Sequence, residues 1–260
     1  LFLFQTNQMS GIVLVTGATS GIGEASARIF AKNGYDLILT GRRHMRLARL
    51  QDEFEGLGIK VWTLCFDIRQ KDDTEAAINN LPEEWKDIDI LVNNAGLASG
   101  LDPIQDGDVE DWEKMIDTNI KGLLYISRKV SKLMEQRKSG HIINVGSVAG
   151  KFAYPNGNVY SATKYAVNSL TQGMRIDLVK HGIRVSQVSP GLVETEFSKV
   201  RFHGNEEKAK DVYNWLEPLK GEDIADAIYW MATRPAHVNI NDIWIMPTAQ
   251  ASPAYTNQNT

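Results

Sequence analysis

A tyrosine and a lysine stand four residues apart in the segment Tyr160-Ser161-Ala162-Thr163-Lys164. On a helix this spacing places both side chains on one face. A phenol titrates near 10, but an ammonium about 4 Å away contributes roughly 4 kcal/mol at an effective dielectric of about 20. That attraction is large enough to bring the pKa of the phenol toward neutrality. The pair therefore predicts a general acid–base, Tyr160, whose pKa is lowered by Lys164.

A serine precedes this pair at a position where ligands commonly bind. Ser147 directly follows the apolar run 141–146, which predicts a strand. Ligands of open α/β sheets bind at the carboxyl ends of strands, so Ser147 is a candidate site residue. The residues alone leave plainer interpretations open, namely a tyrosine packed on a buried helix beside an extended lysine, and a serine that caps a turn.

A glycine-rich turn joins an apolar run to a helical pattern near the start of the chain. The segment reads Thr16-Gly17-Ala18-Thr19-Ser20-Gly21-Ile22-Gly23. Glycines let the backbone turn tightly and approach a pyrophosphate, whose charge the helix N-terminus stabilises. The predicted phosphate-binding residues are Gly17, Ser20, Gly21, Ile22 and Gly23. A simple tight turn is the alternative interpretation of a glycine motif.

The end of the second predicted strand indicates which dinucleotide binds. A site for NAD places a carboxylate there to bond the ribose 2′-hydroxyl. This chain instead has Gly41-Arg42-Arg43. Guanidinium groups suit a 2′-phosphate, because they are permanently charged and present paired donors. Arg42 and Arg43 therefore favour NADP, against the alternative of a solvated basic turn.

Strands and helices alternate along the chain in the pattern of a doubly wound parallel sheet. We expect strands at 12–16, 35–40, 60–66, 88–93, 141–146, 184–189 and 242–246. Helical patterns lie near 21–33, 46–55, 72–81, 109–138, 157–181 and 222–233. These elements predict one α/β Rossmann domain over 9–260, with helices on both faces of a seven-stranded sheet. Residues 1–8 are interpreted as an upstream extension or an expression remnant, and the polar segment 192–220 as a substrate cap.

Composition excludes several other classes of protein. The 260 residues carry 28 Lys and Arg against 32 Asp and Glu, a net charge of -4, so nucleic acid and anionic membranes are not expected partners. The five histidines show no metal-ligand spacing, and no metal is expected. The single cysteine, Cys65, excludes an internal disulfide and fits a reducing, cytoplasmic setting.

Taken together, the motifs resemble the short-chain dehydrogenase/reductase family. The resemblance rests on the glycine loop, Asn93-Asn94-Ala95-Gly96, Asn119, Ser147, Tyr160-x-x-x-Lys164 and Pro190-Gly191, and it spans residues 11 to about 247. Within the family the chain is similar to NADP-dependent dehydrogenases of 3-hydroxy acids, which also oxidise L-allo-threonine and serine. That closer similarity rests on Glu110-Asp111-Trp112, the segment 190–198, Val200-Arg201-Phe202 and the segment 235–241.

The resemblance implies a fold, an assembly and a role for each motif residue. It implies strand order 3-2-1-4-5-6-7, and a homotetramer with contacts through the helices at 109–138 and 157–181. It implies a catalytic set of Asn119, Ser147, Tyr160 and Lys164, in which Ser147 orients the substrate oxygen and Asn119 supports a water in the proton path. The implied cofactor contacts are Asp67 with the adenine, Asn93 with the adenosine-side ribose, and Val193 and Thr195 with the carboxamide. Ala95, Gly96, Tyr160, Lys164, Pro190 and Gly191 complete the implied cofactor site.

The substrate of such an enzyme would be a short hydroxy acid, whose affinity must come largely from its charge. Of the basic residues in the cap, Arg201 has the paired donors that best hold a carboxylate. Alternation with Val200 and Phe202 would turn Arg201 away from two apolar neighbours if this stretch is extended. A reductase of a neutral carbonyl compound and a non-catalytic NADP-sensing regulator are the alternative functions. A solvated Arg201, or one paired with Glu194 or Glu196, is the alternative interpretation of that residue.

Overall fold

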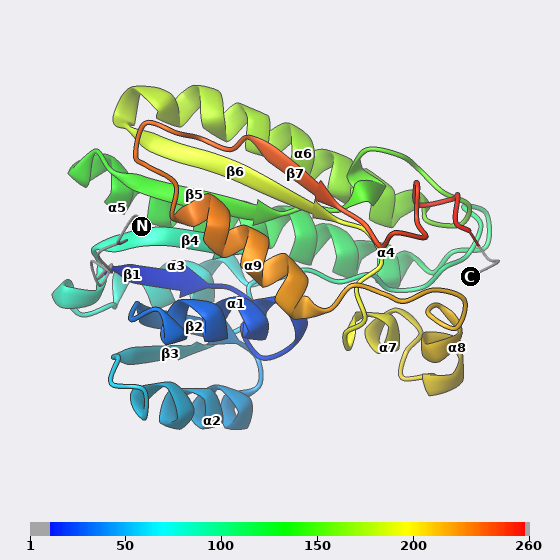
Figure 1. Ribbon diagram of the computed structural model, residues 1–260, viewed down its shortest axis with the longest axis horizontal. Coiled ribbons are helices and arrows are strands. Elements are labelled where there is room, and N and C mark those ends of the chain that lie inside the picture. Colours follow the sequence, from blue (N-terminus) through cyan, green and yellow to red (C-terminus); the bar gives the residue numbers. More distant parts are fainter. Residues whose placement is uncertain (1–10, 258–260) are drawn as a thin grey trace, which may run out of the picture.

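One parallel sheet organises the chain in the computed structural model, which describes residues 11–257 (Figure 1). Its strand order is β3-β2-β1-β4-β5-β6-β7, and every neighbouring pair is parallel. This order confirms the one implied by the motifs. The strands are β1 (Ile12–Val15), β2 (Asp36–Gly41), β3 (Val61–Cys65), β4 (Ile88–Asn93), β5 (Gly140–Val145), β6 (Ile183–Pro190) and β7 (Asp242–Ile245).

Both faces of the sheet are covered, which is why the central strands are continuous apolar runs. Leu37 and Leu39 of β2 face one hydrophobic core, while Ile38 between them faces the other. Side chains of α1 (Gly21–Lys32), α2 (His44–Glu55) and α9 (Gly221–Ala232) join the first core. Those of α3 (Lys71–Asn79), α5 (Leu123–Arg137) and α6 (Asn158–Leu178) pack in the second. In Figure 1 the orange helix α9 crosses in front of the strands.

The long helix predicted over 109–138 is interrupted in the structure. It consists of α4 (Val109–Ile116), a π-helical turn (Asp117–Gly122) and α5. Two hydrogen bonds join the buried Asn119 side chain to the backbone of Leu97, and Gly122 packs against Ile68 too closely to admit a side chain. Both contacts are tertiary, so hydrophobic periodicity alone could not show the break. Single π-helical turns of this kind are frequent at functional sites.

The segment 192–220, predicted as a polar substrate cap, contains two short helices. They are α7 (Phe197–Arg201) and α8 (Glu206–Asp211). The ends of the segment are tied together, because the amide of Leu219 donates to the carbonyl of Leu192 and the amide of Glu194 donates to the carbonyl of Leu219. The segment therefore forms a compact loop whose two ends lie at the carboxyl edge of the sheet.

Over residues 11–257, no helix combines the length and the apolar character that a membrane crossing requires. The same residues contain no cluster of three or more His, Cys, Asp or Glu side chains that could hold a metal ion.

The first turn of α1 packs directly on the loop that precedes it. A methyl group at Gly23 would overlap the carbonyl oxygen of Gly17 and the side-chain amide of Asn94. Gly173, inside α6, is different, because nothing lies within 4 Å of the place where its side chain would begin.

We therefore expect Gly23→Ala to lower the free energy of unfolding by about 1–3 kcal/mol, since overpacking forces the backbone apart. Gly173→Ala is the matched control and should be neutral or stabilising by up to about 1 kcal/mol, because alanine is the better helix former. Urea unfolding of both variants measures the difference. Equal midpoints for the two variants would contradict this account of the α1 packing.

Candidate active site

A cleft of about 390 Å³ lies at the carboxyl edge of the sheet, where parallel α/β proteins bind ligands. Its walls come from the glycine loop, the ends of β2, β4, β5 and β6, the cap segment and the chain after β7. Most of the residues that the sequence predicted for the site line it. They are Gly17, Ser20, Gly21, Ile22, Arg42, Arg43, Asp67, Ala95, Gly96, Ser147, Tyr160, Lys164, Pro190, Gly191, Val193, Thr195 and Arg201.

Three predicted residues lie behind the wall of the cleft. Gly23 permits the close packing of α1 described above. Asn93, expected at the ribose, is instead buried, and its amide donates to Ser127 Oγ and Asn144 Oδ1 at 2.8 Å each. That expectation is corrected by the structure: Asn93 is an inward-facing strand residue, and its neighbour Asn94 lines the cleft.

Asn119 is the third residue behind the wall, and it holds two parts of the site together. Its Oδ1 accepts from the amide of Leu97 at 2.8 Å, and its Nδ2 donates to the carbonyl of Leu97 at 2.8 Å. The same Nδ2 lies 3.0 Å from Thr163 Oγ1, on the helix that carries Tyr160 and Lys164. Asn119 therefore connects the loop after β4 to α6.

The glycine loop and the loop after β4 are joined by Thr16 and Asn94. Thr16 Oγ1 accepts from the amides of Asn94 and Ala95, both at 3.0 Å. Asn94 Nδ2 returns hydrogen bonds to the carbonyls of Thr16 and Gly17 at 2.9 and 3.2 Å. Gly17 and Gly21 have positive φ angles of 65° and 55°, which non-glycine residues adopt only with strain. The turn leaves the N-terminus of α1 facing the cleft, as a bound pyrophosphate requires.

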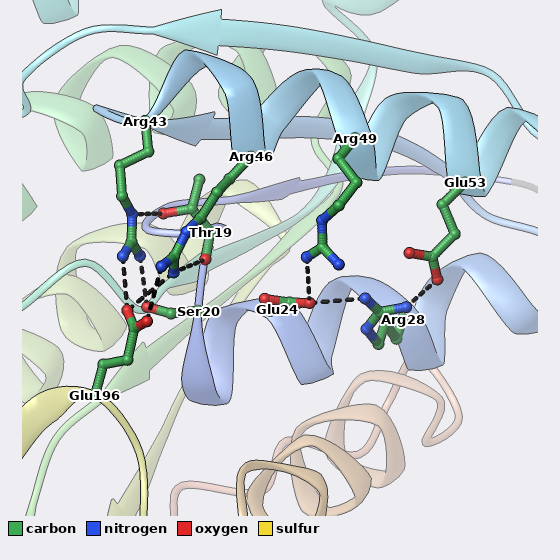
Figure 2. Close-up of polar contacts among 9 residues, drawn as sticks. All are labelled: Thr19, Ser20, Glu24, Arg28, Arg43, Arg46, Arg49, Glu53 and Glu196. Carbon is green, nitrogen blue, oxygen red and sulfur yellow. Dashed lines mark hydrogen bonds and ion pairs between the residues drawn. The ribbon is translucent and has the colours of Figure 1, made fainter.

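The two arginines after β2 lie in different environments. The side chain of Arg42 is 60% exposed, and its nearest acidic partner is Asp67 at 3.8 Å. Arg43 is held on three sides, by Thr19 Oγ1 at 2.9 Å, Ser20 Oγ at 2.7 Å and Glu196 of the cap at 2.6 Å (Figure 2). Arg42 thus presents an open guanidinium, whereas Arg43 joins the glycine loop to the cap.

Ser147 lies just past β5, as the sequence predicted. Its Oγ accepts from the amide of Ala149 at 3.1 Å, so it also caps the short 3-10 turn that follows. The hydroxyl group contacts Tyr160 as well, and this hydrogen bond lowers the pKa of the phenol. The serine is therefore both a turn cap and a neighbour of the tyrosine hydroxyl.

Lys164 is buried on the same face of α6 as Tyr160. Its Nζ donates to the carbonyl of Val145 at 3.0 Å and lies 5.9 Å from the centre of the Tyr160 ring. Burial lowers the pKa of Lys164 to about 8, because the charged ammonium loses its hydration. The amine therefore titrates close to neutral pH.

The pKa of Tyr160 departs from its sequence-based prediction. Burial raises it to about 12, and Tyr154 adds to the rise, while Arg201 and the hydroxyl of Ser147 lower it. The ammonium of Lys164 was expected about 4 Å from the phenol, but it points to a main-chain carbonyl instead. In this interior the cost of desolvating a phenolate exceeds the attraction of nearby charges. Tyr160 is therefore held in its neutral, protonated form.

Arg201 lies beside the tyrosine at the substrate end of the cleft. Its guanidinium carbon is 5.0 Å from the centre of the Tyr160 ring, and its Nη2 donates to Tyr154 Oη at 2.7 Å. The buried Nε of Arg201 has no hydrogen-bond partner within residues 11–257. The stretch is the last turn of α7 rather than extended, so the alternation argument was wrong, because tertiary contacts of the cap stabilise a helix there. The predicted position of the residue in the site nevertheless agrees with the structure.

Comparisons with known proteins place this arrangement in a family. The sequence model described as short chain dehydrogenase matches residues 11–206. The chain belongs to the short-chain dehydrogenase family. The NADP-dependent 3-hydroxy acid dehydrogenase YdfG of Salmonella typhi is 52% identical over 241 residues, or 92% of this chain and 96% of that protein. Sulfoacetaldehyde reductase 2 of Chromohalobacter salexigens is 46% identical over 248 residues, or 95% of this chain and 98% of that protein.

Solved structures agree with the fold of this short-chain dehydrogenase. The closed form of serine dehydrogenase complexed with NADP+ is 47% identical, with a TM-score of 0.90 over 96% of this chain and 100% of that one. Serine dehydrogenase from Escherichia coli is 44% identical, with a TM-score of 0.80 over 92% of this chain and 99% of that one. The family and fold that the motifs indicated are thereby confirmed.

Several residues of this short-chain dehydrogenase site were missed in the sequence. Tyr154 and Phe197 line the cleft beside Tyr160, and Gln250, after β7, accepts from the amide of Leu192 at 2.9 Å. Tyr154 could have been predicted from the sequence, because it is an aromatic residue in the loop between Ser147 and Tyr160, and that loop must cross the cleft. Gln250 carries no such signal, since only the tertiary fold returns the end of the chain to Pro190-Gly191.

Proposed function

We propose that this protein is an NADP-dependent dehydrogenase of short 3-hydroxy acids, including substrates of the serine and L-allo-threonine type. The observation that carries the proposal is the placement of Arg201, whose guanidinium, with its Nε buried, lies against the ring of Tyr160 in the cleft. It brings a fixed positive charge next to a proton donor. A short hydroxy acid likewise carries its carboxylate a few bonds from its reacting oxygen.

The residues present fit NADP along the length of the cleft. The glycine loop and the N-terminus of α1 would receive the pyrophosphate, with Arg42 and Arg43 at the 2′-phosphate. Asp67 would lie at the adenine, and Val193 and Thr195 at the carboxamide. When bound, the nicotinamide exchanges a hydride with the carbon of the substrate hydroxyl.

Tyr160 would exchange the proton that accompanies this reaction. Because its pKa is raised to about 12, the phenol carries a proton at neutral pH and can donate it to a carbonyl oxygen. In the oxidative direction the phenol must lose that proton. The Ser147 hydroxyl and the Arg201 guanidinium, which both lower the pKa of Tyr160, would then stabilise the phenolate.

Lys164 and Asn119 would serve the same proton transfer from behind the phenol. The amine of Lys164 titrates near 8, so it exchanges protons readily at neutral pH. Asn119 holds the loop at Leu97 against α6 and so keeps the wall behind Lys164 in place. Its support of a water molecule in the proton path is the role that the family resemblance implies.

The names of the relatives support an anionic substrate over a neutral carbonyl compound. One is named for 3-hydroxy acids and another for sulfoacetaldehyde. A carboxylate and a sulfonate are both small anions that a guanidinium binds well. A neutral substrate would not offer the negative charge that the guanidinium of Arg201 can pair with at this position.

The molecular surface supports the assembly that the resemblance implies. Tyr165, Ile176 and Val179 are exposed along α6 and its C-terminal turn, and Leu124 is exposed on α5. Covering such apolar side chains stabilises subunit contacts. We therefore expect a homotetramer built through α5 and α6. Separately, we expect this protein to work in the cytoplasm, which is the setting that its single cysteine favours.

Arg42 is expected to set the preference for NADP over NAD. Loss of a charge-assisted contact costs about 1.5–3 kcal/mol, so Arg42→Ala should weaken NADP binding roughly tenfold to a hundredfold and leave NAD binding nearly unchanged. Titration of both cofactors measures this. Arg49→Ala is the matched control, because Arg49 also lies on the α2 side but pairs with Glu24 outside the cleft. Equal affinity of the unmodified protein for NAD and NADP would refute the assignment.

Tyr160 is expected to carry the proton. Tyr160→Phe keeps the ring and should bind NADP normally, yet lose turnover by about 10²–10⁴-fold. Tyr165→Phe on the same helix is the control, since its hydroxyl donates to the carbonyl of Lys151 outside the cleft. Steady-state rates of both variants test the role. If Tyr160→Phe keeps more than half of the activity, another group moves the proton.

Arg201 is expected to bind the substrate carboxylate. Arg201→Ala should raise the KM for a 3-hydroxy acid roughly tenfold or more, and Arg201→Lys should restore part of the loss, because charge returns without the paired donors. The corresponding amide is the control substrate and its KM should change little. Turnover of both substrates is expected to fall somewhat, since Arg201 also lowers the pKa of Tyr160. Equal effects on the KM of acid and amide would show that Arg201 supports the loop and that another residue binds the carboxylate.

A further inference from the structure

The short helix α7 spans the distance between the two charged ends of the cleft. Glu196 immediately precedes the helix and contacts Arg43 and Arg46, beside the glycine loop. Arg201 is the last residue of the helix and contacts Tyr154 at the substrate end. At about 1.5 Å per residue the five residues of α7 extend over only about 7.5 Å, so its two ends belong to one short rigid turn.

Glu196 is held more firmly than an ordinary surface carboxylate. One oxygen accepts from Arg43 at 2.6 Å and from Arg46 at 3.0 Å, and the other accepts from Arg46 at 2.9 Å (Figure 2). Hydrogen bonds from Arg46, followed by those from Arg43, lower the pKa of Glu196 to about 2. An isolated surface ion pair contributes little, but paired donors on one carboxylate within a network fix its position.

The network that holds Glu196 is itself anchored to the body of the protein. Arg46 Nη1 also donates to the carbonyl of Thr19 at 3.2 Å, and Arg43 bonds the side chains of Thr19 and Ser20. Figure 2 shows both arginines reaching from the start of α2 across the glycine loop to Glu196. The start of α7 is therefore tied to the loop that receives the cofactor phosphates.

The other end of α7 is packed on the reacting tyrosine. The rings of Phe197 and Tyr160 meet edge to face, with centres 5.7 Å apart. The guanidinium of Arg201 lies 5.5 Å from the Phe197 ring and 5.0 Å from the Tyr160 ring. The place of α7 therefore sets where the guanidinium lies relative to the phenol.

Binding of a 2′-phosphate does not require Glu196 to leave. Arg42 lines the cleft with a 60% exposed side chain and pairs with Asp67 rather than Glu196, whereas Arg46, which holds Glu196 with two hydrogen bonds, lies outside the lining of the cleft. A guanidinium has five N–H donors, so Arg43 retains donors beyond those that bond Thr19, Ser20 and Glu196. Carboxylate and phosphate can share the same arginine.

We propose that Glu196 is a positioning residue for substrate recognition: its ion pairs with Arg43 and Arg46 anchor α7 to the cofactor-phosphate end of the cleft and thereby hold Arg201 in place for the substrate carboxylate. The inference rests on the proposed function of Arg201. It assigns Glu196 and Arg46 a role in the choice between acid and neutral substrates. Neither residue touches the reacting atoms.

The test compares the KM of a 3-hydroxy acid with that of its amide at saturating NADP. Glu196→Gln keeps the shape and removes the charge, and it should raise the KM of the acid about fivefold or more while the KM of the amide and both kcat values stay within twofold. Arg46→Ala removes the partner from the other side and should act in the same way. The double variant should be no worse than Glu196→Gln alone, because Glu196→Gln already breaks the ion pair that Arg46→Ala removes.

Glu206→Gln is the matched control. Glu206 also pairs with α7, through Lys199 at 2.8 Å, but the pair is exposed and does not reach the glycine loop. Glu206→Gln should leave the ratio of the KM of the acid to the KM of the amide within twofold of its value in the unmodified protein. Thermal unfolding of each variant confirms that the chain is folded, and Arg46→Ala replaces Glu196→Gln if the latter does not fold.

The outcomes separate this inference from the proposed function. If Arg201→Ala weakens the acid selectively but Glu196→Gln and Arg46→Ala do not, the substrate site stands and the positioning role of Glu196 is refuted. If the two variants raise the KM of acid and amide alike, Glu196 merely supports the cap, and the inference is again refuted. If Arg201→Ala itself shows no selectivity, the proposed substrate site fails and the inference fails with it.

Discussion

The joining of two loops at the carboxyl edge of the sheet is the constraint on which the rest of the site depends. Thr16 and Asn94 exchange hydrogen bonds between the ends of β1 and β4 at 2.9 and 3.0 Å, and the amide of Ala95 also donates to Thr16 Oγ1 at 3.0 Å. In the strand order β3-β2-β1-β4 the chain changes direction at this pair, so helices leave to opposite faces and a cleft opens between them. The same bonds hold the glycine loop, Ala95 and Gly96 at its floor.

Burial decides the chemistry that the cleft can support. It raises the pKa of Tyr160 to about 12 and lowers that of Lys164 to about 8, because burial disfavours the charged form of each group. The interior thus keeps the proton on the phenol and makes the amine able to exchange one near neutral pH. Ser147 and Arg201 oppose the effect of burial on the phenol. A buried acid with such neighbours is typical of a site whose proton moves only during reaction.

The short helix α7 of the cap places a charged residue at each end of the cleft. Glu196 and Arg201 lie at opposite ends of α7, and each is held by a partner from another part of the fold. Tyr213 adds a further tie, because its hydroxyl lies 2.6 Å from Ser198 Oγ and donates to the carbonyl of Val193 at 3.0 Å. The cap is therefore a connected unit, and recognition of a cofactor and of a substrate share its contacts.

The sequence by itself determined the fold class and most of the cleft, because these depend on local patterns, while the strand order came from the family resemblance that the motifs carry. Apolar runs predict buried parallel strands, and Gly17, Gly21, Ser147, Tyr160 and Lys164 lie at element ends or at helical spacing, which local chemistry dictates. Only the tertiary structure decided the pKa of Tyr160, the inward turn of Asn93, the π-helical turn at Asn119 and the partners of Glu196. Each of these depends on groups distant in the chain, as with Glu196 and Arg43, which lie 153 residues apart. Burial and long-range hydrogen bonds leave no periodic trace in the sequence, so such features appear only when the chain is folded.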